Sequence, residues 1–539
     1  MTREPDFEKR TMPEILTRTA ERFPAAAALS FMGRKISFKV LEAQVNRFAR
    51  ALAATGVAAG DKVSVLLPNM PQSVIATYAI LKIGAVAVMN NPLAAEEELA
   101  FQLGDSEATT LVTLDLRLPL VSDLKKKTAV RSIIACHVTD YLPFPGNKLL
   151  RYLQPGLYRK IEPEAQDFLL LLAKYSDAPV ESRARWDDLG ALLYTAGTMG
   201  ASRGVMLTHG NISCAAQQFR AWLPELRDGA ESILAVFPFF HAAGWTAVQH
   251  LSILAGWTDI LVPHPEPPAV LEIMGKRCPT LLPGSPAVFG SLLENEKFRR
   301  TGFSSVKAFL AGMAPLTRKV RDGLQSLGPR PVLNLYGLAE TGFAGTAGLW
   351  NGPGKPGTVG LPLPGTRLRI VDPETGTRDL PAGEAGEVCF QGPQVMQGYY
   401  KKPEKSAEVL REGWLFSGDM GFLDQEGYLT LLGRKKDRIM TQGGAVYPWD
   451  IERILMAHPK VADACAVGLP AGPSTEVVKA WLVLKPGEKA DAEELIAHCR
   501  GLLSPDQIPQ GIAFIDRLPR NDAGEVRREK VRELAGKSR

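Results

Sequence analysis

The chain has 539 residues, a length typical of three or four structural units at roughly 150 residues each. Hydrophobic residues make up 45% of the chain and charged residues 22%, which excludes a disordered chain and allows a large buried core. The formal net charge of +5 is too weak over this length to indicate nucleic-acid binding.

Cysteine usage and the apolar runs indicate the cellular compartment. The six cysteines are scattered and form no C-x-x-C pair, which suits a reducing cytosol better than a disulfide framework or a zinc site. Apolar runs such as residues 74–89 are interrupted and fall short of the ~20 residues that a membrane span needs. The first nine residues are acidic and polar and do not resemble a signal peptide. We therefore expect a cytoplasmic enzyme.

Much of the first 300 residues alternates short apolar runs with helical patterns. Residues 61–67 are expected to form a buried strand, residues 72–83 a helix and residues 85–89 a second strand. This spacing is typical of βαβ units and predicts parallel sheet.

The later part of the chain has a different pattern. Residues 355–432 are rich in glycine and proline, and their short apolar runs at 367–371 and 386–391 predict a small β-structured region. A domain boundary is expected near Lys436, within a charged stretch. The last hundred residues have an α+β pattern of their own, with helices expected at 449–457 and 491–503 and strands at 463–468 and 478–485.

A glycine-rich loop is the sharpest local feature. Residues 192–205 read LLYTAGTMGASRGV, an apolar strand that runs into a loop with glycines, hydroxyls and one arginine. Glycines let a backbone curl around an anion, and hydroxyls and a cation add donors. The spacing does not match the P-loop of NTPases. Taken alone, the segment is either a phosphate-binding loop or a plain turn, with a helix expected behind it at 211–223.

This loop resembles the YTSGTTGxPKGV motif of the adenylate-forming superfamily, which includes acyl-CoA synthetases, luciferases and peptide-synthetase adenylation domains. Further segments resemble the superfamily's motifs in the same order: PFFHAAG at 238–244, AGMAPL at 311–316, LYGLAET at 335–341, WLFSGD at 414–419, GRKKDRI at 433–439 and LPRNDAGEVRR at 518–528. Because the matches continue in order into the last twenty residues, the chain is identified as a member, similar to acyl-CoA synthetases of the long-chain fatty acid–CoA ligase type.

The resemblance implies a fold and a reaction. The fold would be α/β: an N-terminal AMP-binding domain (1–435) of two parallel-sheet αβ subdomains and a small β-barrel-like subdomain, then a small mobile α+β C-terminal domain (436–539). In the implied reaction, a carboxylate attacks the α-phosphate of Mg·ATP to give acyl-AMP and pyrophosphate. The thiol of coenzyme A then displaces AMP. ATP or AMP, coenzyme A and Mg²⁺ are the implied cofactors.

The resemblance also implies which residues bind the nucleotide. The loop would hold the pyrophosphate end of ATP, Glu340 would bind Mg²⁺, and Asp419 and Arg434 would bind the ribose. The alternatives are a surface glutamate for Glu340 and a turn cap for Asp419. The remaining implied contacts are Thr195, Gly197, Thr198, Gly200 and Arg203 in the loop, and Gly312, Met313, Ala314, Tyr336 and Gly337 beside the nucleotide.

Three further residues have implied roles in turnover. His241 would lie beside the acyl carboxylate, where it donates a hydrogen bond or moves aside for the thiol. Lys436 matches the hinge about which the C-terminal domain rotates between the half-reactions. Gly443 would face the thioester step. A buried core histidine and a flexible turn remain the alternatives for His241 and Gly443.

Several positions depart from the superfamily pattern. Ala196 and Met199 remove two hydroxyls from the loop, and Ala339 replaces a threonine next to the implied magnesium ligand. Ser202 and Arg203 replace a proline and a lysine, so the charge is kept with a different geometry.

The most serious departure is Glu525. It stands where the superfamily has the lysine that bridges the acyl carboxylate and the α-phosphate, so the resemblance implies a catalytic position here, as it does at His241, Glu340 and Lys436. We therefore expect a weak or absent adenylation step, with less effect on the thioester step. Two alternatives stay open: Arg527 or Arg528 pairs with Glu525 at the surface, or Lys530 replaces the lysine after a slip of the loop register.

Substrate signals favour a hydrophobic acid. Residues 141–161 mix aromatic, leucine and basic residues, and look similar to an insertion of long-chain fatty acyl-CoA synthetases. They are expected either to touch the inner face of a membrane or to form a packed surface loop. The expected walls of the acyl pocket are apolar: Phe239, Phe240, Trp245, Gly284 and Gly312.

Together these features predict an acyl-CoA ligase of fatty acid metabolism that mainly converts the acyl-AMP of a hydrophobic carboxylic acid into acyl-CoA. A partner adenylating enzyme would supply the acyl-AMP. An ordinary complete ATP-dependent long-chain fatty acid–CoA ligase is one alternative, and a non-catalytic acyl or nucleotide carrier on the same fold is another.

Overall fold

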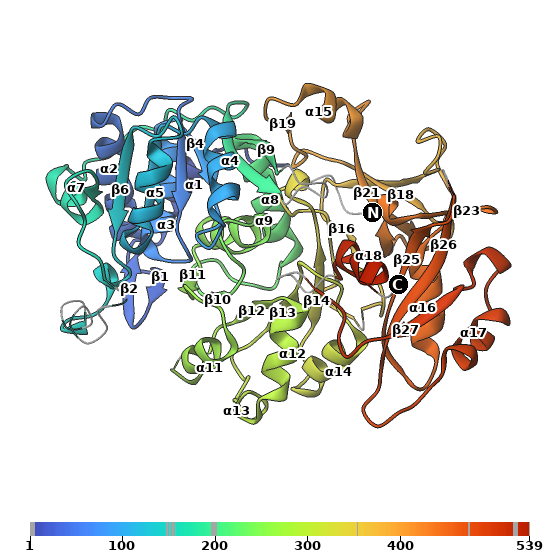
Figure 1. Ribbon diagram of the computed structural model, residues 1–539. Coiled ribbons are helices and arrows are strands. Elements are labelled where there is room, and N and C mark those ends of the chain that lie inside the picture. Colours follow the sequence, from blue (N-terminus) through green and yellow to red (C-terminus); the bar gives the residue numbers. More distant parts are fainter. Residues whose placement is uncertain are drawn as a thin grey trace. The chain divides into compact units, whose positions relative to one another are not determined.

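The computed structural model describes residues 6–146, 149, 152, 156, 158–195, 202–276, 278–352, 354–472, 475–520 and 526–537. The chain forms two compact units, which are described separately (Figure 1). The first unit contains Met1–Leu368 and Phe390–Leu415, and the second contains Arg369–Cys389 and Phe416–Arg539.

An eight-stranded sheet forms part of the first unit, in the order β19-β9-β8-β4-β3-β5-β6-β7. Its six strands from β8 to β7 are parallel, whereas β9 and β19 are antiparallel to their neighbours. The strands are β3 (Lys62–Leu66), β4 (Val86–Met89), β5 (Thr110–Leu114), β6 (Ser132–Cys136), β7 (Gln166–Asp167), β8 (Leu189–Thr195), β9 (Arg203–Thr208) and β19 (Gly398–Tyr399).

The predicted βαβ unit is part of this sheet. Helix α3 (Pro71–Lys82) connects β3 to β4 and is buried on every side, which explains its nearly continuous apolar sequence. Proline suits the first position of the helix, because an N–H there would have no partner within the helix. The other helices near this sheet are α2 (Phe38–Ala54), α4 (Glu96–Ser106), α5 (Leu118–Lys125) and α7 (Phe168–Lys174), coloured blue to teal in Figure 1.

A nine-stranded sheet has the order β16-β15-β14-β13-β12-β10-β11-β1-β2. It is parallel from β14 to β1, and its outer strands are antiparallel. The strands are β1 (Ala27–Phe31), β2 (Arg34–Ser37), β10 (Ser232–Ala235), β11 (Thr258–Leu261), β12 (Leu281–Gly284), β13 (Ala308–Ala311), β14 (Val332–Tyr336), β15 (Thr346–Ala347) and β16 (Leu361–Pro362).

Helices accompany this second sheet as well. They are α1 (Met12–Arg22), α8 (His209–Trp222), α9 (Ala242–Gly244), the π-helix η4 (Trp245–His250), α10 (Leu251–Ala255), α11 (Pro267–Lys276), α12 (Pro286–Glu294), α13 (Glu296–Arg299) and α14 (Arg318–Ser326). The packing of α11, α12 and α14 with β12 and β13 buries an aromatic cluster that includes Phe289, Phe298 and Phe309.

The glycine-rich region forms the predicted β-structure. Strands β17 (Arg367–Val371) and β18 (Gly386–Gln391) have the bounds expected from the sequence. They join a five-stranded sheet with β20 (Leu410–Arg411), β21 (Trp414–Leu423) and β22 (Leu429–Arg434), and α15 (Pro403–Val409) precedes β20.

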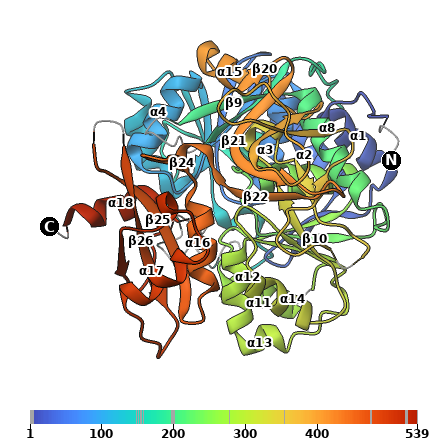
Figure 2. The same ribbon diagram turned by 90° about the vertical axis from the view of Figure 1, so that its right-hand side faces the viewer.

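The second unit has the predicted α+β pattern (Figure 2). Cys465 and Val467 of β25 (Val461–Pro470) pack against α18 (Arg528–Lys537), whereas Ala464 and Ala466 pack against α16 (Pro448–Ala457) and α17 (Ala492–Arg500). Alternate residues of a strand point to opposite faces, so β25 builds two cores. Its sheet also contains β26 (Glu476–Leu484) and β27 (Gly511–Phe514), and the hairpin β23 (Ile439–Thr441) and β24 (Gly444–Val446) completes the unit.

Membrane-spanning helices are absent from the part of the chain that the structure describes. None of its helices combines the length and the apolar character that a bilayer crossing needs.

Candidate active site

The glycine-rich loop joins two antiparallel strands. Thr195 ends β8 and pairs with Arg203, which begins β9. The Ser202 hydroxyl donates a hydrogen bond of 2.9 Å to the Thr195 carbonyl, which links the two ends of the loop. The loop residues Gly197, Thr198 and Gly200, and the departures Ala196 and Met199, lie outside the described residues.

Glu340, the expected magnesium ligand, lies in a 3₁₀ turn, η5 (Ala339–Thr341). Its Oε1 accepts a hydrogen bond of 2.7 Å from the Tyr399 hydroxyl. Its carbonyl accepts a hydrogen bond of 2.8 Å from the Met396 amide. The Arg203 guanidinium lies 5.3 Å from the centre of the Tyr399 ring. Residues far apart in the sequence thus place a carboxylate, a hydroxyl and a cation together.

Tyr399 was not expected from the sequence. Burial and the nearby Glu340 carboxylate raise its pKa, so the hydroxyl remains a proton donor. The tripeptide Gly398-Tyr399-Tyr400 does not match any of the motifs used to predict the site. Only the pairing of β19 with β9 reveals its position, and that pairing joins segments almost two hundred residues apart.

His241, expected beside the acyl carboxylate, caps the short helix α9. Its Nδ1 accepts a hydrogen bond of 3.1 Å from the Ala243 amide. Burial lowers the pKa of His241 to about 4, so near neutral pH the ring is uncharged, with its proton on Nε2. The ring lies 6.3 Å from that of Phe343. His241 is therefore only partly exposed, and its uncharged ring keeps a donor nitrogen.

Glycine is required in the turn that holds His241. A Cβ at Gly244 would lie 2.2 Å from the Pro238 carbonyl oxygen, far inside van der Waals contact. This close approach accounts for the glycine that ends the PFFHAAG segment.

The residues expected beside the nucleotide lie at the carboxyl ends of adjacent strands. Gly312 and Met313 follow β13, and Tyr336 and Gly337 end and follow β14, which pairs with β13 in parallel. Ligands of open α/β sheets bind at this edge. Met313 has a φ of +70°, which turns the chain away from the strand direction before Ala314.

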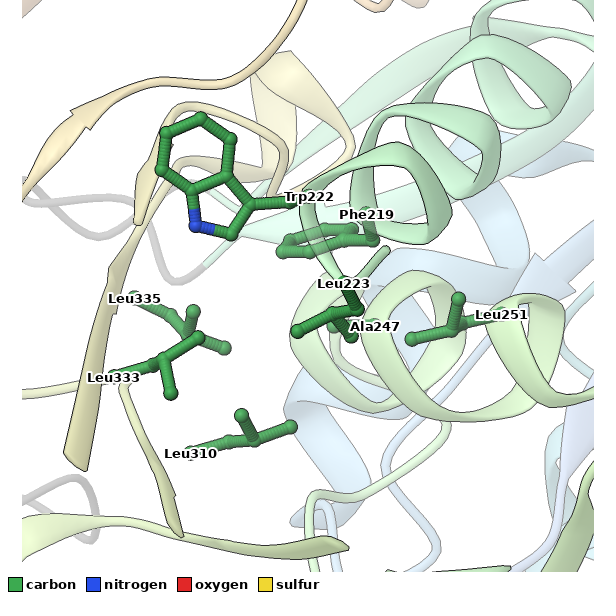
Figure 3. A pocket seen from close by; sticks show the side chains of 8 residues that line it. All are labelled: Phe219, Trp222, Leu223, Ala247, Leu251, Leu310, Leu333 and Leu335. Carbon is green, nitrogen blue, oxygen red and sulfur yellow. The ribbon is translucent and has the colours of Figure 1, made fainter. Parts of the chain in front are cut away.

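An apolar pocket lies behind Phe343. Its ring stacks 6.4 Å from that of Phe219, one of the lining residues, and its tip would lie 3.1 Å from a Cβ at Gly312. The lining residues are all apolar or aromatic, as Figure 3 shows: Phe219, Trp222, Leu223, Ala247, Leu251, Leu310, Leu333 and Leu335. None of these eight belongs to the pocket walls expected from the sequence.

In the second unit, the structure brings the two expected ribose residues together. Asp419 of β21 is the register partner of Arg434 of β22, and their side chains form an ion pair of 2.7 Å. Asp419 is 5% exposed. It lies within β21 and does not cap a turn. The Ser417 hydroxyl accepts a hydrogen bond from its amide.

The expected hinge and thioester-facing residues also lie in the second unit. Lys436 is in the 3₁₀ turn η6 (Lys435–Asp437), where partial burial lowers its pKa. Gly443 lies in the turn between β23 and β24, where a Cβ would collide with the Asp506 carboxylate. Glu525 lies outside the described residues.

Comparison with known proteins decides the family. The family model described as AMP-binding enzyme matches residues 16–400, and that of the AMP-binding enzyme C-terminal domain matches residues 450–525. The chain belongs to the AMP-binding enzyme family. Within it, a long-chain-fatty-acid–CoA ligase of Bacillus subtilis (strain 168) is 38% identical over 97% of this chain and 94% of its own length.

Two further proteins agree with this result. A feruloyl-CoA synthase of an Amycolatopsis species is 31% identical, covering 96% of this chain and 98% of its own. The crystal structure of ATP-bound MatB from Rhodopseudomonas palustris has a TM-score of 0.84 and 27% identity, covering 97% of this chain and 99% of its own. The resemblance and the expected α/β fold are thus confirmed, and the chain is an AMP-forming acyl-CoA ligase. Membership implies ATP or AMP and coenzyme A as its ligands.

The described residues suit a magnesium ion held together with nucleotide phosphates. They contain no group of three or more histidine, cysteine or acidic side chains that could hold a metal alone. Mg²⁺ binds through one or two carboxylates, water and substrate phosphates, so the single carboxylate of Glu340 fits this mode. Its Oε2 makes no hydrogen bond to another described residue.

Buried histidines predict loss of stability in acid. Burial lowers the pKa of His209 and His241 to about 4 and of His250 to about 3, so the unfolded chain takes up protons first as the pH falls below about 6.5. Between about pH 6.5 and its pKa in the folded protein, each histidine lowers the free energy of unfolding by up to about 1.4 kcal/mol per pH unit. We expect the melting temperature to fall over this range, and to fall less steeply in His209→Leu. The exposed His264→Leu should follow the parent, and equal slopes for all three proteins would contradict the assignment.

Proposed function

We propose that this ligase mainly carries out the second half of the family reaction, the conversion of a hydrophobic acyl-AMP into acyl-CoA. The observation that carries the proposal is Glu525, which stands where the family motif has its adenylation lysine. In the proposed step, the thiol sulfur of coenzyme A bonds to the acyl carbon and the bond from that carbon to the phosphate oxygen breaks. AMP leaves, and the thiol proton passes to solvent.

The first half-reaction needs the missing cation most. A carboxylate attacks the α-phosphorus while the bond to pyrophosphate breaks, so several negative charges meet at one centre. Losing one preorganised donor costs on the order of 3 kcal/mol. A unit charge pair at ~4 Å is worth roughly 4 kcal/mol at an effective dielectric near 20, and the Glu525 carboxylate reverses its sign. Several powers of ten in adenylation rate are at stake.

The residues that flank Glu525 favour the proposal over a slipped register. Arg520 and Val526 form an antiparallel bridge, and the Arg527 amide donates a hydrogen bond of 2.8 Å to the Pro519 carbonyl. These bonds define the pairing on both sides of the loop. Lys530 lies in α18, where its Nζ is 2.9 Å from Glu533.

The arginines near Glu525 also have other partners. Arg528 binds Glu452 through both terminal guanidinium nitrogens, Nη1 and Nη2, and Arg527 lies 3.0 Å from Glu529. Neither the surface pairing of Glu525 nor its replacement by Lys530 gains support from these contacts.

Residues that serve turnover argue against a non-catalytic carrier. The Asp419–Arg434 pair suits the two ribose hydroxyls, because a carboxylate only accepts hydrogen bonds. Neutral His241 keeps Nε2–H to donate to the acyl group. We also propose that Lys436 is the hinge between domains 1–435 and 436–539, and that Gly443 faces the thioester step.

We propose that the acyl chain opens and enters the apolar pocket beside Phe219, which in this structure has room for about one water molecule. Phe343 lies against Gly312, beside His241 and next to the pocket, so a chain entering it would have its carboxyl end near His241. The names of two relatives, a long-chain-fatty-acid–CoA ligase and a feruloyl-CoA synthase, support a hydrophobic acyl group.

Filling this pocket should shorten the accepted chain. Ala247 is buried in η4 and lines the pocket, so Ala247→Leu adds methyl groups inside it. Overpacking costs roughly 1–3 kcal/mol. We expect the rate with palmitoyl-AMP to fall about tenfold or more. Butyryl-AMP, which needs little of the pocket, should react as before, and an equal loss for both substrates would contradict the assignment.

We further propose contact with the inner face of a membrane through residues 141–161 and the tip of the β1–β2 hairpin. Pro143 lies 3.5 Å from the position of a Cβ at Gly33, so the tip and the start of the segment are adjacent. Met32 is 54% exposed and Phe144 78% exposed. Residues 141–161 contain four basic and no acidic residues, which complements an anionic bilayer.

Vesicle binding tests this contact. The double variant Met32→Ser, Phe144→Ser should pellet with phosphatidylglycerol vesicles about tenfold less than the parent, because two exposed apolar side chains no longer enter the interface. Leu170→Ser is a matched control, since Leu170 is 71% exposed on α7. Unchanged pelleting of the double variant would leave a packed surface loop as the better description.

A two-arm assay tests the proposed function. One arm supplies a fatty acid, Mg·ATP and coenzyme A; the other supplies synthetic acyl-AMP and coenzyme A, and both measure acyl-CoA. Product only in the second arm supports the proposal, including its partner enzyme that makes acyl-AMP. Product at similar rates in both arms favours the complete ligase, and product in neither favours the carrier.

A further inference from the structure

Tyr399 connects the two groups of the first unit that are proposed to meet the nucleotide's phosphates and metal. Its hydroxyl donates to Glu340 Oε1 over 2.7 Å, and Arg203 lies over its ring at 5.3 Å. One side chain therefore contacts both the Glu340 carboxylate and the Arg203 guanidinium.

The backbone holds Tyr399 in this position from several sides. Strand β19 pairs with β9, with Tyr399 opposite Val205. The Tyr400 amide donates to the Gly204 carbonyl over 2.8 Å, next to Arg203. The Met396 amide donates to the Glu340 carbonyl over 2.8 Å. Residues 396–400 thus connect the η5 turn to β9, the strand that follows the glycine-rich loop.

We propose that Tyr399 is a positioning residue that orients the Glu340 carboxylate toward a magnesium ion and the Arg203 guanidinium toward the nucleotide phosphates. The inference rests on the expected role of Glu340 as the magnesium ligand of the proposed reaction family. The hydroxyl binds Oε1, so Oε2 would be the oxygen offered to a magnesium ion, and the carboxylate would already be held in place when the metal–nucleotide complex binds.

Arginine suits this arrangement better than the lysine of the family motif. A guanidinium stacks on an aromatic face and still presents donors at its edge, whereas an ammonium is a strongly hydrated point charge. The arginine that replaces the motif's lysine at position 203 is therefore matched to the ring of Tyr399.

Nucleotide binding without turnover provides the test. ATP is titrated calorimetrically into the full-length protein without carboxylate or coenzyme A, at a series of Mg²⁺ concentrations and in EDTA. Tyr399→Phe keeps the ring and removes the hydroxyl, and we expect it to need about tenfold more Mg²⁺ for half of the magnesium-dependent gain in affinity. Tyr400→Phe is the matched control, since Tyr400 packs against Lys62 and Lys401 instead.

A second variant separates positioning from a general structural effect. If Tyr399 acts through Glu340, Tyr399→Phe should change nothing further in a Glu340→Gln background. Equal magnesium dependence in the parent and Tyr399→Phe would overturn the inference, as would additive losses in the double variant. A parent without any magnesium dependence would instead reject the role of Glu340. The proposed split reaction is tested by acyl-CoA formation and is unaffected by either result.

Discussion

Replacing Glu525 with lysine is expected to raise ATP-dependent acyl-AMP formation by on the order of a hundredfold or more. The variant removes a repulsive carboxylate and supplies a donor for the charge that develops between the acyl carboxylate and the α-phosphate. The measurement is pyrophosphate release with a fatty acid and Mg·ATP. Acyl-AMP conversion should change little, because the proposed thioester step uses the other orientation of the C-terminal domain.

A neutral replacement separates the two parts of this effect. Glu525→Gln removes the repulsion without adding a cation, so its gain should fall between those of the parent and Glu525→Lys. If lysine gives no gain, the remaining departures Ala196, Met199 and Ala339 become the cause of weak adenylation. If the parent already releases pyrophosphate at the rate of the lysine variant, Glu525 is not limiting.

Breaking the Arg528 ion pair should strongly destabilise the second unit. Arg528 joins the start of α18 to Glu452 of α16, with Nη2 at 2.9 Å from Oε2, and its Nε lies 3.4 Å from Asp437 in the turn η6. Its side chain is 18% exposed. Removing one partner leaves a largely buried carboxylate unpaired, and we expect Arg528→Met to lower the free energy of unfolding by about 3 kcal/mol.

Urea unfolding measures this loss, with hydrogen exchange of β25 and α18 locating it. Lys530→Met is the matched control, because Lys530 forms an exposed pair with Glu533 on the same helix and should cost less than about 0.5 kcal/mol. Similar unfolding midpoints for the two variants would show that the Arg528–Glu452 pair contributes no more than a surface pair.

The fold was predictable where local patterns decide it. The run at 61–67 and the pattern at 72–83 correspond to β3 and α3, because an apolar run beside a helical period leaves few other arrangements. The helix expected at 211–223 corresponds to α8. The π-helix η4 gave no such signal, since its sequence, WTAVQH, mixes apolar and polar residues that are all buried, so no one-sided pattern marks the change of helical period.

The candidate site was predictable only where a motif lies within one segment. His241 and Glu340 stand in contiguous motifs, but neither the acceptor state of His241 Nδ1 nor the Tyr399 contact follows from spacing. The apolar pocket was likewise missed, because its walls come from α8, η4, α10, β13 and β14. Such contacts arise from sheet order and helix packing, which one sequence does not specify.

Carboxylate-dependent exchange of labelled pyrophosphate into ATP isolates the first half-reaction from everything that follows it. The account predicts that the parent protein shows almost no exchange with a long-chain fatty acid, while it converts the corresponding acyl-AMP and coenzyme A to acyl-CoA, and that Glu525→Lys restores exchange. Exchange by the parent as fast as its conversion of acyl-AMP would contradict it and identify a complete ligase.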